Sequence, residues 1–285
     1  MTSDFGHAPN RRARIAEALK FNHAPRIMGI VNATEDSFFA GSRATGHDAI
    51  QRGLAMWDAG ATWIDVGGES TRPGAEPVSI VAEKKRVVPV IEGLRAARPE
   101  GLISIDTRHA EVARAALQAG ADMVNDVSGL RDPAMVELVV ETGCAVCIMH
   151  MQGEPGSMQD NPSYADVVSE VGQMLEDVKA ELVGRGHPEA LICIDPGIGF
   201  GKTQDHNIAL LQAGRSVLKS NGAILWGVSR KSVVGHLTGH ANPEDRLAGT
   251  LGLAAVAHRM NIDILRVHDV QEHADLLAAL AIHSA

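Results

Sequence analysis

The chain is poor in aromatic side chains and in cysteine. Phe, Trp and Tyr make up only 3% of its 285 residues, although 45% of the residues are hydrophobic. The core must therefore be built mainly from Val, Ile, Leu and Ala, which is typical of a parallel sheet covered by helices. Three cysteines, a small and odd number for this length, argue against a disulfide framework and indicate a reducing compartment.

The chain also lacks basic runs and long apolar segments. Lys and Arg number 26 against 35 Asp and Glu, which gives a formal net charge of -9. This acidic balance argues against a nucleic-acid partner. No apolar run reaches the ~18 residues of a membrane span, and the polar N-terminus has no signal-peptide core. We therefore expect a cytoplasmic protein with neither nucleic-acid nor membrane partners.

Short apolar runs alternate with longer amphipathic stretches. The runs are rich in β-branched residues and bounded by Gly, Asp, Asn or Pro, as is typical of buried strands. We expect strands at residues 27–31, 63–66, 102–105, 123–124, 145–149, 191–194, 224–228 and 262–267. We expect helices at residues 47–59, 79–97, 110–119, 133–141, 164–185, 205–220, 243–260 and 271–282.

Eight strand–helix repeats in one series predict an α/β protein with a (β/α)₈ TIM barrel. The alternative is a doubly wound open sheet, for which six strands would be enough. No Gly-, Ser- or Pro-rich linker divides the chain, so we expect a single domain over residues 25–285. Residues 1–24 precede the first strand, and we expect them to form a short segment that caps the bottom of the barrel.

Polar residues end almost every predicted strand, which is where barrel enzymes place their active sites. Asp106, Asn125 and Asp195 suit a flat heterocycle, because carboxylates accept paired N–H groups and an amide both donates and accepts. Arg266 and His268 are two residues apart on a strand and so point to the same side, where they suit a phosphate. These strand ends predict a site for a small polar molecule.

The strand-end motifs, taken in this order, resemble the dihydropteroate synthase family. The matching segments are residues 28–32, 65–74, 104–107, 125–129, 149–153, 195–202, 229–232 and 266–270. Together they extend from about residue 25 to residue 270, and their combination is highly specific, although each is weak alone. The resemblance implies an enzyme that joins a pterin diphosphate to p-aminobenzoate with loss of pyrophosphate, using Mg²⁺ and acting as a homodimer.

The resemblance also implies roles for individual residues. The pterin pocket would be formed by Asp106, Asn125, Asp195, Lys231, Met149 and Phe200. The diphosphate would be held by Arg266, His268 and Asn32, with Mg²⁺ at Asn32. Catalysis would depend on four of these residues, namely Lys231, Arg266, His268 and Asp106.

The p-aminobenzoate site is the part of the resemblance that lies in loops. It would be framed by Thr71, Arg72, Pro73 and Ser232, and completed by Asp36 and Phe38 from the first loop. That loop departs from the family pattern, since Glu35 replaces a proline and Phe39-Ala40 replaces Ser-Asp. Phe38 keeps the family position, so we expect a sulfonamide-sensitive enzyme.

Two other functions share parts of this pattern. A pterin-binding methyltransferase barrel, which moves a methyl group from a reduced folate to a corrinoid, has similar pterin-facing residues. It should lack the basic residues at 229–232 and the pair Arg266 and His268. A catalytically silent pterin-binding paralogue is the second alternative, and the intact Asp106 and Lys231 argue against it.

Overall fold

Eight parallel strands close into a barrel in the order β1 to β8. The structure is a computed structural model that describes residues 9–33, 45–69 and 78–284. The strands are β1 (Arg26–Asn32), β2 (Trp63–Gly67), β3 (Leu102–Asp106), β4 (Met123–Asp126), β5 (Ala145–Met149), β6 (Ile192–Asp195), β7 (Ala223–Trp226) and β8 (Ile264–Val267). The predicted (β/α)₈ barrel is confirmed, and the open-sheet alternative is wrong.

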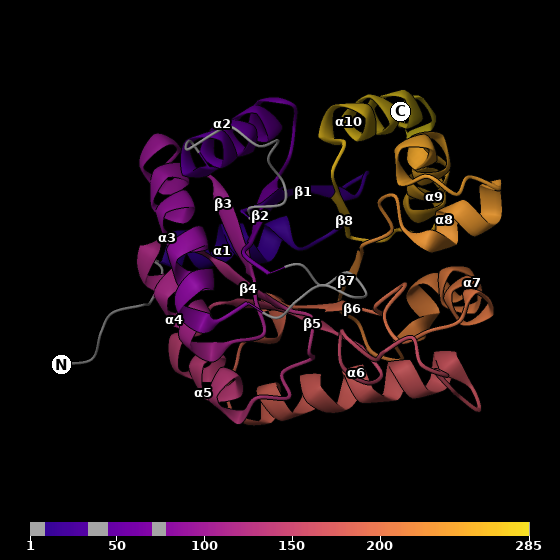
Figure 1. Ribbon diagram of the computed structural model, residues 1–285, viewed down its shortest axis with the longest axis horizontal. Coiled ribbons are helices and arrows are strands. Elements are labelled where there is room, and N and C mark those ends of the chain that lie inside the picture. Colours follow the sequence, from indigo (N-terminus) through magenta and orange to yellow (C-terminus); the bar gives the residue numbers. More distant parts are fainter. Residues whose placement is uncertain (1–8, 34–44, 70–77, 285) are drawn as a thin grey trace.

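Helices form a ring around the barrel (Figure 1). Eight of them correspond to predicted helices: α2 (Thr45–Asp58), α3 (Ile80–Ala97), α4 (Ala110–Ala119), α5 (Pro133–Thr142), α6 (Val167–Gly184), α7 (Gln204–Ala213), α9 (Leu247–Arg259) and α10 (Val270–Leu280). Among the described residues, two further helices were not predicted, α1 (Pro9–Ala18) and α8 (Ser232–Thr238). In the part of the chain that the structure describes, short 3₁₀ turns also occur: η2 (Glu189–Leu191), η3 (Gly214–Val217), η4 (Pro243–Arg246) and η5 (Ala281–Ser284).

Local sequence signals fix several helix ends. Asp132 begins α5 by accepting a hydrogen bond from the backbone N–H of Ala134, which satisfies a helix N–H that has no partner within the helix. Gly120 and Gly143 end α4 and α5 in the left-handed conformation that glycine adopts without steric cost. The helix predicted at 205–220 is too long, because α7 ends at Ala213 and Gly214 turns the chain with a φ of 54°.

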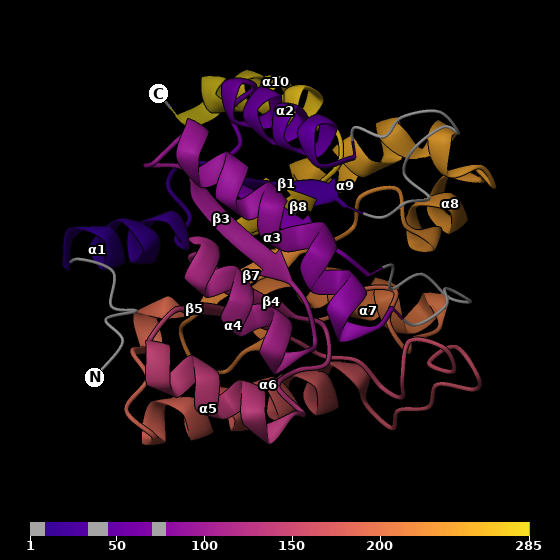
Figure 2. The ribbon, with the colours of Figure 1, turned by 60° about the vertical axis from the view of Figure 1, so that its left-hand side comes forward.

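Side chains alternate between the lumen of the barrel and its helix-covered outside. Ile64 and Val66 on β2 pack in the large core under the helices. Trp63, between β1 and β3, packs in a second cluster with Met28 and Leu102, which also contains residues of α1. The Trp63 indole N–H donates to the carbonyl of Ala18 at 3.1 Å. Helix α1 therefore closes the N-terminal end of the barrel, outside the ring of helices (Figure 2).

Candidate active site

Two carboxylates and a guanidinium meet in the lumen above the apolar layer. Arg266 on β8 donates through Nε to Asp65 Oδ2 and through Nη2 to Asp106 Oδ2, both at 2.6 Å. Burial acts to lower the pKa of Arg266, but the charges of Asp65 and Asp106 raise it above its usual value. These contacts join β8 to β2 and β3, so the ion pairs link strands that are not neighbours in the barrel.

Asp65 is a site residue that the sequence analysis did not single out. It is fully buried, and its Oδ2 also accepts a hydrogen bond from the Asn125 amide at 3.1 Å. Its other oxygen has no hydrogen-bond partner among the described residues. The strand pattern of the sequence could have placed Asp65 in the lumen. Asp65 lies two residues from Trp63 and from Gly67 on one strand, so all three residues face the same side.

Burial changes the proton affinity of the two predicted pterin-facing acids. It raises the pKa of Asp106 to about 7, although the charge of Arg266 opposes the change. Burial also raises the pKa of Asp195, against the opposing charge of Lys231 and a 2.7 Å hydrogen bond from the Gly197 N–H. Both acids therefore hold a proton more readily than a solvated carboxylate does, as is typical of functional sites.

Lys231 lies over the ring of Phe200. Its ammonium nitrogen is 4.4 Å from the ring centroid and donates to the carbonyl of Ile198 at 2.6 Å. Burial lowers the pKa of Lys231 to about 8, although the nearby Asp195 favours the charged form. Phe200 packs in turn against a small apolar cluster that contains Met149 and three other residues: Val127, Met151 and Met158. The site thus has one apolar wall and one charged wall.

The ends of β7 and β8 are tied together beside this wall. His268 Nδ1 is 3.0 Å from Ser229 Oγ. Arg230 has a left-handed backbone with φ of 57° and forms two hydrogen bonds with Asp269, at 2.9 and 2.7 Å. This bidentate pair fixes the turn, so the residues on either side of Arg230 have defined positions. Ser232 follows as the exposed first residue of α8.

The predicted site residues fall into three groups. Those whose contacts join them in one cluster are Asp106, Asn125, Asp195, Lys231, Met149, Phe200 and Arg266. Asn32, His268 and Ser232 lie at neighbouring strand or helix ends, and Asn32 is paired in register with Gly67. The predictions at Asp36, Phe38, Thr71, Arg72 and Pro73 lie outside the described residues.

No group of three or more His, Cys, Asp or Glu side chains suited to a metal ion occurs in the described parts of the chain. The cysteines are free and buried, with Cys144 under the helices and Cys147 in the lumen cluster. Cys144 and Cys147, three residues apart, therefore pack in different core clusters and are not bonded to each other.

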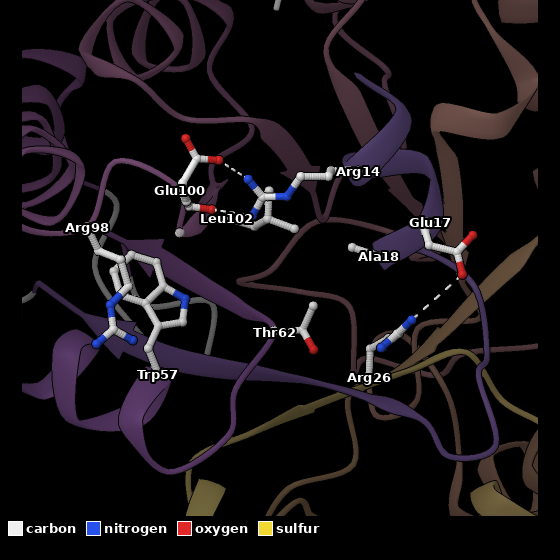
Figure 3. Close-up of a pocket in the computed structure, with 10 residues that line it drawn as sticks. Arg14, Glu17, Ala18, Arg26, Trp57, Thr62, Arg98, Glu100 and Leu102 are labelled. Carbon is white, nitrogen blue, oxygen red and sulfur yellow. Dashed lines mark hydrogen bonds and ion pairs between the residues drawn. The ribbon is translucent and has the colours of Figure 1, made fainter. Parts of the chain in front are cut away.

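A cavity of about 420 Å³ lies at the opposite end of the barrel, near α1 (Figure 3). Each arginine that lines it has a carboxylate partner: Arg14 contacts Glu100, Arg98 contacts Asp58, and Arg26 lies 3.9 Å from Glu17. Because these charges are already neutralised, they offer a polar ligand little that water does not. The cavity is distant from the strand ends that carry the acid–base cluster, and it is not the candidate active site.

Comparisons with known proteins bear on this site directly. Residues 28–268 match the family described as pterin binding enzyme. The chain is 43% identical over 256 residues to the dihydropteroate synthase of Escherichia coli strain K12, which covers 90% of each chain. The chain belongs to the dihydropteroate synthase family.

Solved structures of dihydropteroate synthases are similar to this chain in fold and in sequence. Dihydropteroate synthase of Xanthomonas albilineans with 4-aminobenzoic acid has a TM-score of 0.85 and 40% identity, covering 92% of this chain and 94% of that one. The same enzyme in complex with 7,8-dihydropteroate has a TM-score of 0.83 and 38% identity over 92% and 94% of the two chains.

The predicted family, fold and activity are thereby confirmed, and the chain is a transferase of folate biosynthesis. These relatives do not support the methyltransferase or the silent paralogue. In residues 9–33, 45–69 and 78–284, no helix has the length and apolar character needed to cross a bilayer.

Proposed function

We propose that the synthase binds its pterin diphosphate in the lumen at the carboxyl ends of the strands and p-aminobenzoate further out. The observation that carries this proposal is the buried acid–base cluster in which Arg266 joins Asp65 and Asp106. The relatives described above, with 4-aminobenzoic acid or 7,8-dihydropteroate bound, support the same pair of substrates.

The pterin ring is the part that the acids and the amide recognise. Asp106, Asn125 and Asp195 supply acceptors and donors at the edge of a flat heterocycle that carries several N–H groups and ring nitrogens. Because burial disfavours their charged forms, the acids gain more from bonding to N–H groups than solvated acids do. Met149 and Phe200 line the ring's faces, and Lys231 reaches the ring from above Phe200.

The diphosphate is the part that the basic residues recognise. Two of the N–H donors of Arg266 are engaged by Asp65 and Asp106. A guanidinium carries five such donors, so others remain to bond phosphate oxygens beside His268. Asn32 completes this group at the end of β1.

Mg²⁺ fits these residues as an ion held mainly by the substrate. It commonly takes one or two protein oxygens together with phosphate oxygens and waters. Asn32 would supply one amide oxygen to the ion, and the described residues contain no group of three or more His, Cys, Asp or Glu side chains that would hold it alone. When bound, Mg²⁺ supplies charge neutralisation on the leaving diphosphate.

The reaction needs no nucleophile from the protein. The bond between the pterin methylene carbon and the diphosphate oxygen breaks, and its electron pair leaves with pyrophosphate. The amine of p-aminobenzoate donates its electron pair to that carbon and loses a proton. Arg266 and His268 stabilise the leaving group, Lys231 and Asp106 hold the pterin, and the apolar wall keeps water from the methylene carbon.

The outer site is assigned to p-aminobenzoate. Thr71, Arg72, Pro73 and Ser232 frame it, and Asp36 and Phe38 complete it, as the family resemblance implies. The exposed position of Ser232 at the start of α8 supports an outer location.

We also propose that the protein is a cytoplasmic homodimer. The buried free cysteines are compatible with a reducing compartment, and sedimentation tests the dimer.

Steady-state kinetics test the site. Asp195→Asn should raise KM for the pterin diphosphate about 10-fold, the effect of losing one charge-assisted hydrogen bond, and change KM for p-aminobenzoate much less. Asp177→Asn, on the outer helix α6, is the matched control and should behave like the wild type. Equal KM values for Asp195→Asn and the control would show that the pterin binds elsewhere.

A further inference from the structure

Lys202 is a buried lysine that the proposed reaction does not use. Its residue is only 3% exposed. Its ammonium nitrogen is 3.0 Å from His150 Nδ1 and donates to the carbonyls of His150 and Phe200 at 3.3 and 3.0 Å. Each of the three ammonium hydrogens therefore has an acceptor. A buried lysine without partners is costly, so these three contacts offset the cost of burying Lys202.

The surroundings of His150 favour a ring that accepts a hydrogen bond from Lys202. It follows β5, its residue is 8% exposed, and its backbone N–H donates to the carbonyl of Asp195 at 3.0 Å. Burial, together with the charge of Lys202, lowers the pKa of His150 to about 3. The ring is therefore neutral, and with its proton on Nε2 it accepts a hydrogen bond from Lys202 at Nδ1.

The β6–α7 loop, residues 196–203, lies directly against the chain that follows β5. Gly197 and Gly201 both have positive φ. A Cβ atom on Gly197 would lie 1.9 Å from the carbonyl oxygen of His150, and one on Gly201 would lie 2.3 Å from that of Gln152. Only glycine allows this approach, so the two loops are in backbone contact at the point where Lys202 joins them.

The same loop presents the partners of Lys231. The Ile198 carbonyl accepts from Lys231 at 2.6 Å, and the Phe200 ring lies 4.4 Å from its ammonium nitrogen. Lys202 donates to the backbone carbonyl of the same Phe200. The position of the Phe200 ring under Lys231 therefore depends on a loop that Lys202 fixes.

We infer that Lys202, with His150 as its acceptor, is a positioning residue that holds the β6–α7 loop so that Phe200 and Lys231 meet the pterin ring. The inference rests on the assignment of Phe200 and Lys231 to the pterin site. It distinguishes Lys202 from a lysine whose burial serves stability alone.

Lys179 provides that comparison within the same chain. It is 5% exposed and donates to Ser220 Oγ at 2.9 Å and to the Asn221 carbonyl, with Glu189 at 2.7 Å. These contacts involve α6, η2 and the segment before β7, and none involves a residue of the candidate site. Lys179→Met thus removes an equally buried ammonium group without touching the β6–α7 loop.

The experiment compares Lys202→Met with Lys179→Met by thermal unfolding and by kinetics for each substrate. Lys202→Met should lower kcat/KM for the pterin diphosphate about 10- to 100-fold, the range for hydrogen bonds to a charged group. KM for the pterin diphosphate should rise and KM for p-aminobenzoate should change less than about threefold. Lys179→Met should lower Tm while both KM values stay within about twofold of the wild type. Matching kinetics in the two folded variants would overturn the inference.

Substitutions at His150 keep the test decisive if Lys202→Met fails to fold. Asn at 150 retains a side-chain oxygen near the position of Nδ1, whereas Leu removes the acceptor. His150→Leu should show the pterin defect, and His150→Asn should show a smaller one. Equal defects in both variants, or none in either, would contradict a role through Lys202.

A Phe200→Ala variant separates this inference from the proposed site. If Phe200→Ala leaves KM for the pterin diphosphate unchanged, the pterin site itself is misassigned. If it raises that KM and Lys202→Met does not, the site stands and only the positioning role of Lys202 fails.

Discussion

The two ends of the barrel bury their lumen residues equally well, but the lumen residues are apolar at one end and charged at the other. On β2, Trp63 and Asp65 are both fully buried and lie two residues apart. Trp63 packs with Met28 and Ile264 in the apolar layer over α1. Asp65 instead pairs with Arg266 in the layer above. Burial alone therefore does not separate a stabilising position from a functional one; the partner does.

The difference has an energetic consequence. Apolar groups that leave water in the lower layer stabilise the fold by about 25 cal/mol per Å². Acids that leave water in the upper layer do so at a cost, which is visible in the raised pKa of Asp106 and Asp195. A protein tolerates such a cost where activity requires it. Substitutions at the two ends should therefore separate stability from turnover.

The largest effect is expected for Lys231→Ala at the functional end. Loss of a cation beside the pterin should lower kcat about 100-fold or more, as removal of one stabilising donor from a desolvated site does. Pyrophosphate release measures the effect. Lys84→Ala, which breaks an exposed pair with Glu111 at 3.1 Å, is the control and should retain full turnover. Near wild-type turnover in Lys231→Ala would place the chemistry elsewhere.

Asp106→Asn should lower activity, and it should also remove a loss of stability that the wild type undergoes as the pH rises. The folded pKa is raised from 3.8 to about 7 by burial, with Arg266, Asp65, Glu83 and Asp126 as the charges that act on it. The cost of ionising Asp106 is absent below the unfolded pKa and complete above the folded one. The wild type should therefore lose stability relative to the variant, on the order of 3 kcal/mol, as pH rises from 4 to 7.

Urea unfolding at pH 4, 5, 6 and 7 measures this difference. Asp205→Asn, in the exposed first turn of α7, controls for loss of a carboxylate that is not buried in the lumen. A wild type that gained stability relative to Asp106→Asn as the pH rose would show that the folded pKa is lowered, not raised.

Ile264→Val at the apolar end should have the reverse profile. Ile264 is fully buried in the layer over α1, and loss of one methylene from such a core costs about 1 kcal/mol. Tm should fall while kcat and both KM values stay at wild-type levels, because no polar contact changes. A kinetic defect without a fall in Tm would mean that the lower layer takes part in the reaction.

The barrel could be predicted because each strand carries its own local signal. Residues 145–149 and 110–119 match β5 and α4 at both ends. Helix α8 was missed because its seven residues are too few for a helical period to emerge. The sequence predicts one helix at residues 205–220 because the apolar spacing continues past Gly214, but the backbone of Gly214 turns the chain.

The site could be predicted where strand ends place residues, but not where the chain folds back on itself. Asp106 and Asn125 follow directly from the ends of β3 and β4. Asp65 lies inside its strand, so its partner is known only once β8 closes the barrel beside β1. The contact of Lys202 with His150 joins residues 52 positions apart, and no spacing in the sequence indicates it.

The smallest effect is expected for an arginine at the apolar end. Arg14 pairs with Glu100, but their side chains are 47% and 77% exposed. Such pairs are screened by water and salt, so Arg14→Ala should change the free energy of unfolding by less than about 1 kcal/mol, and 0.5 M NaCl should abolish the difference. Turnover should not change. Arg266 differs in that it pairs with two carboxylates, Asp65 and Asp106, that are both shielded from water, and Arg266→Ala should reduce turnover at any salt concentration. If Arg14→Ala lowered kcat/KM for either substrate, the cavity near α1 would have a functional role, and the division between the two ends of the barrel would fail.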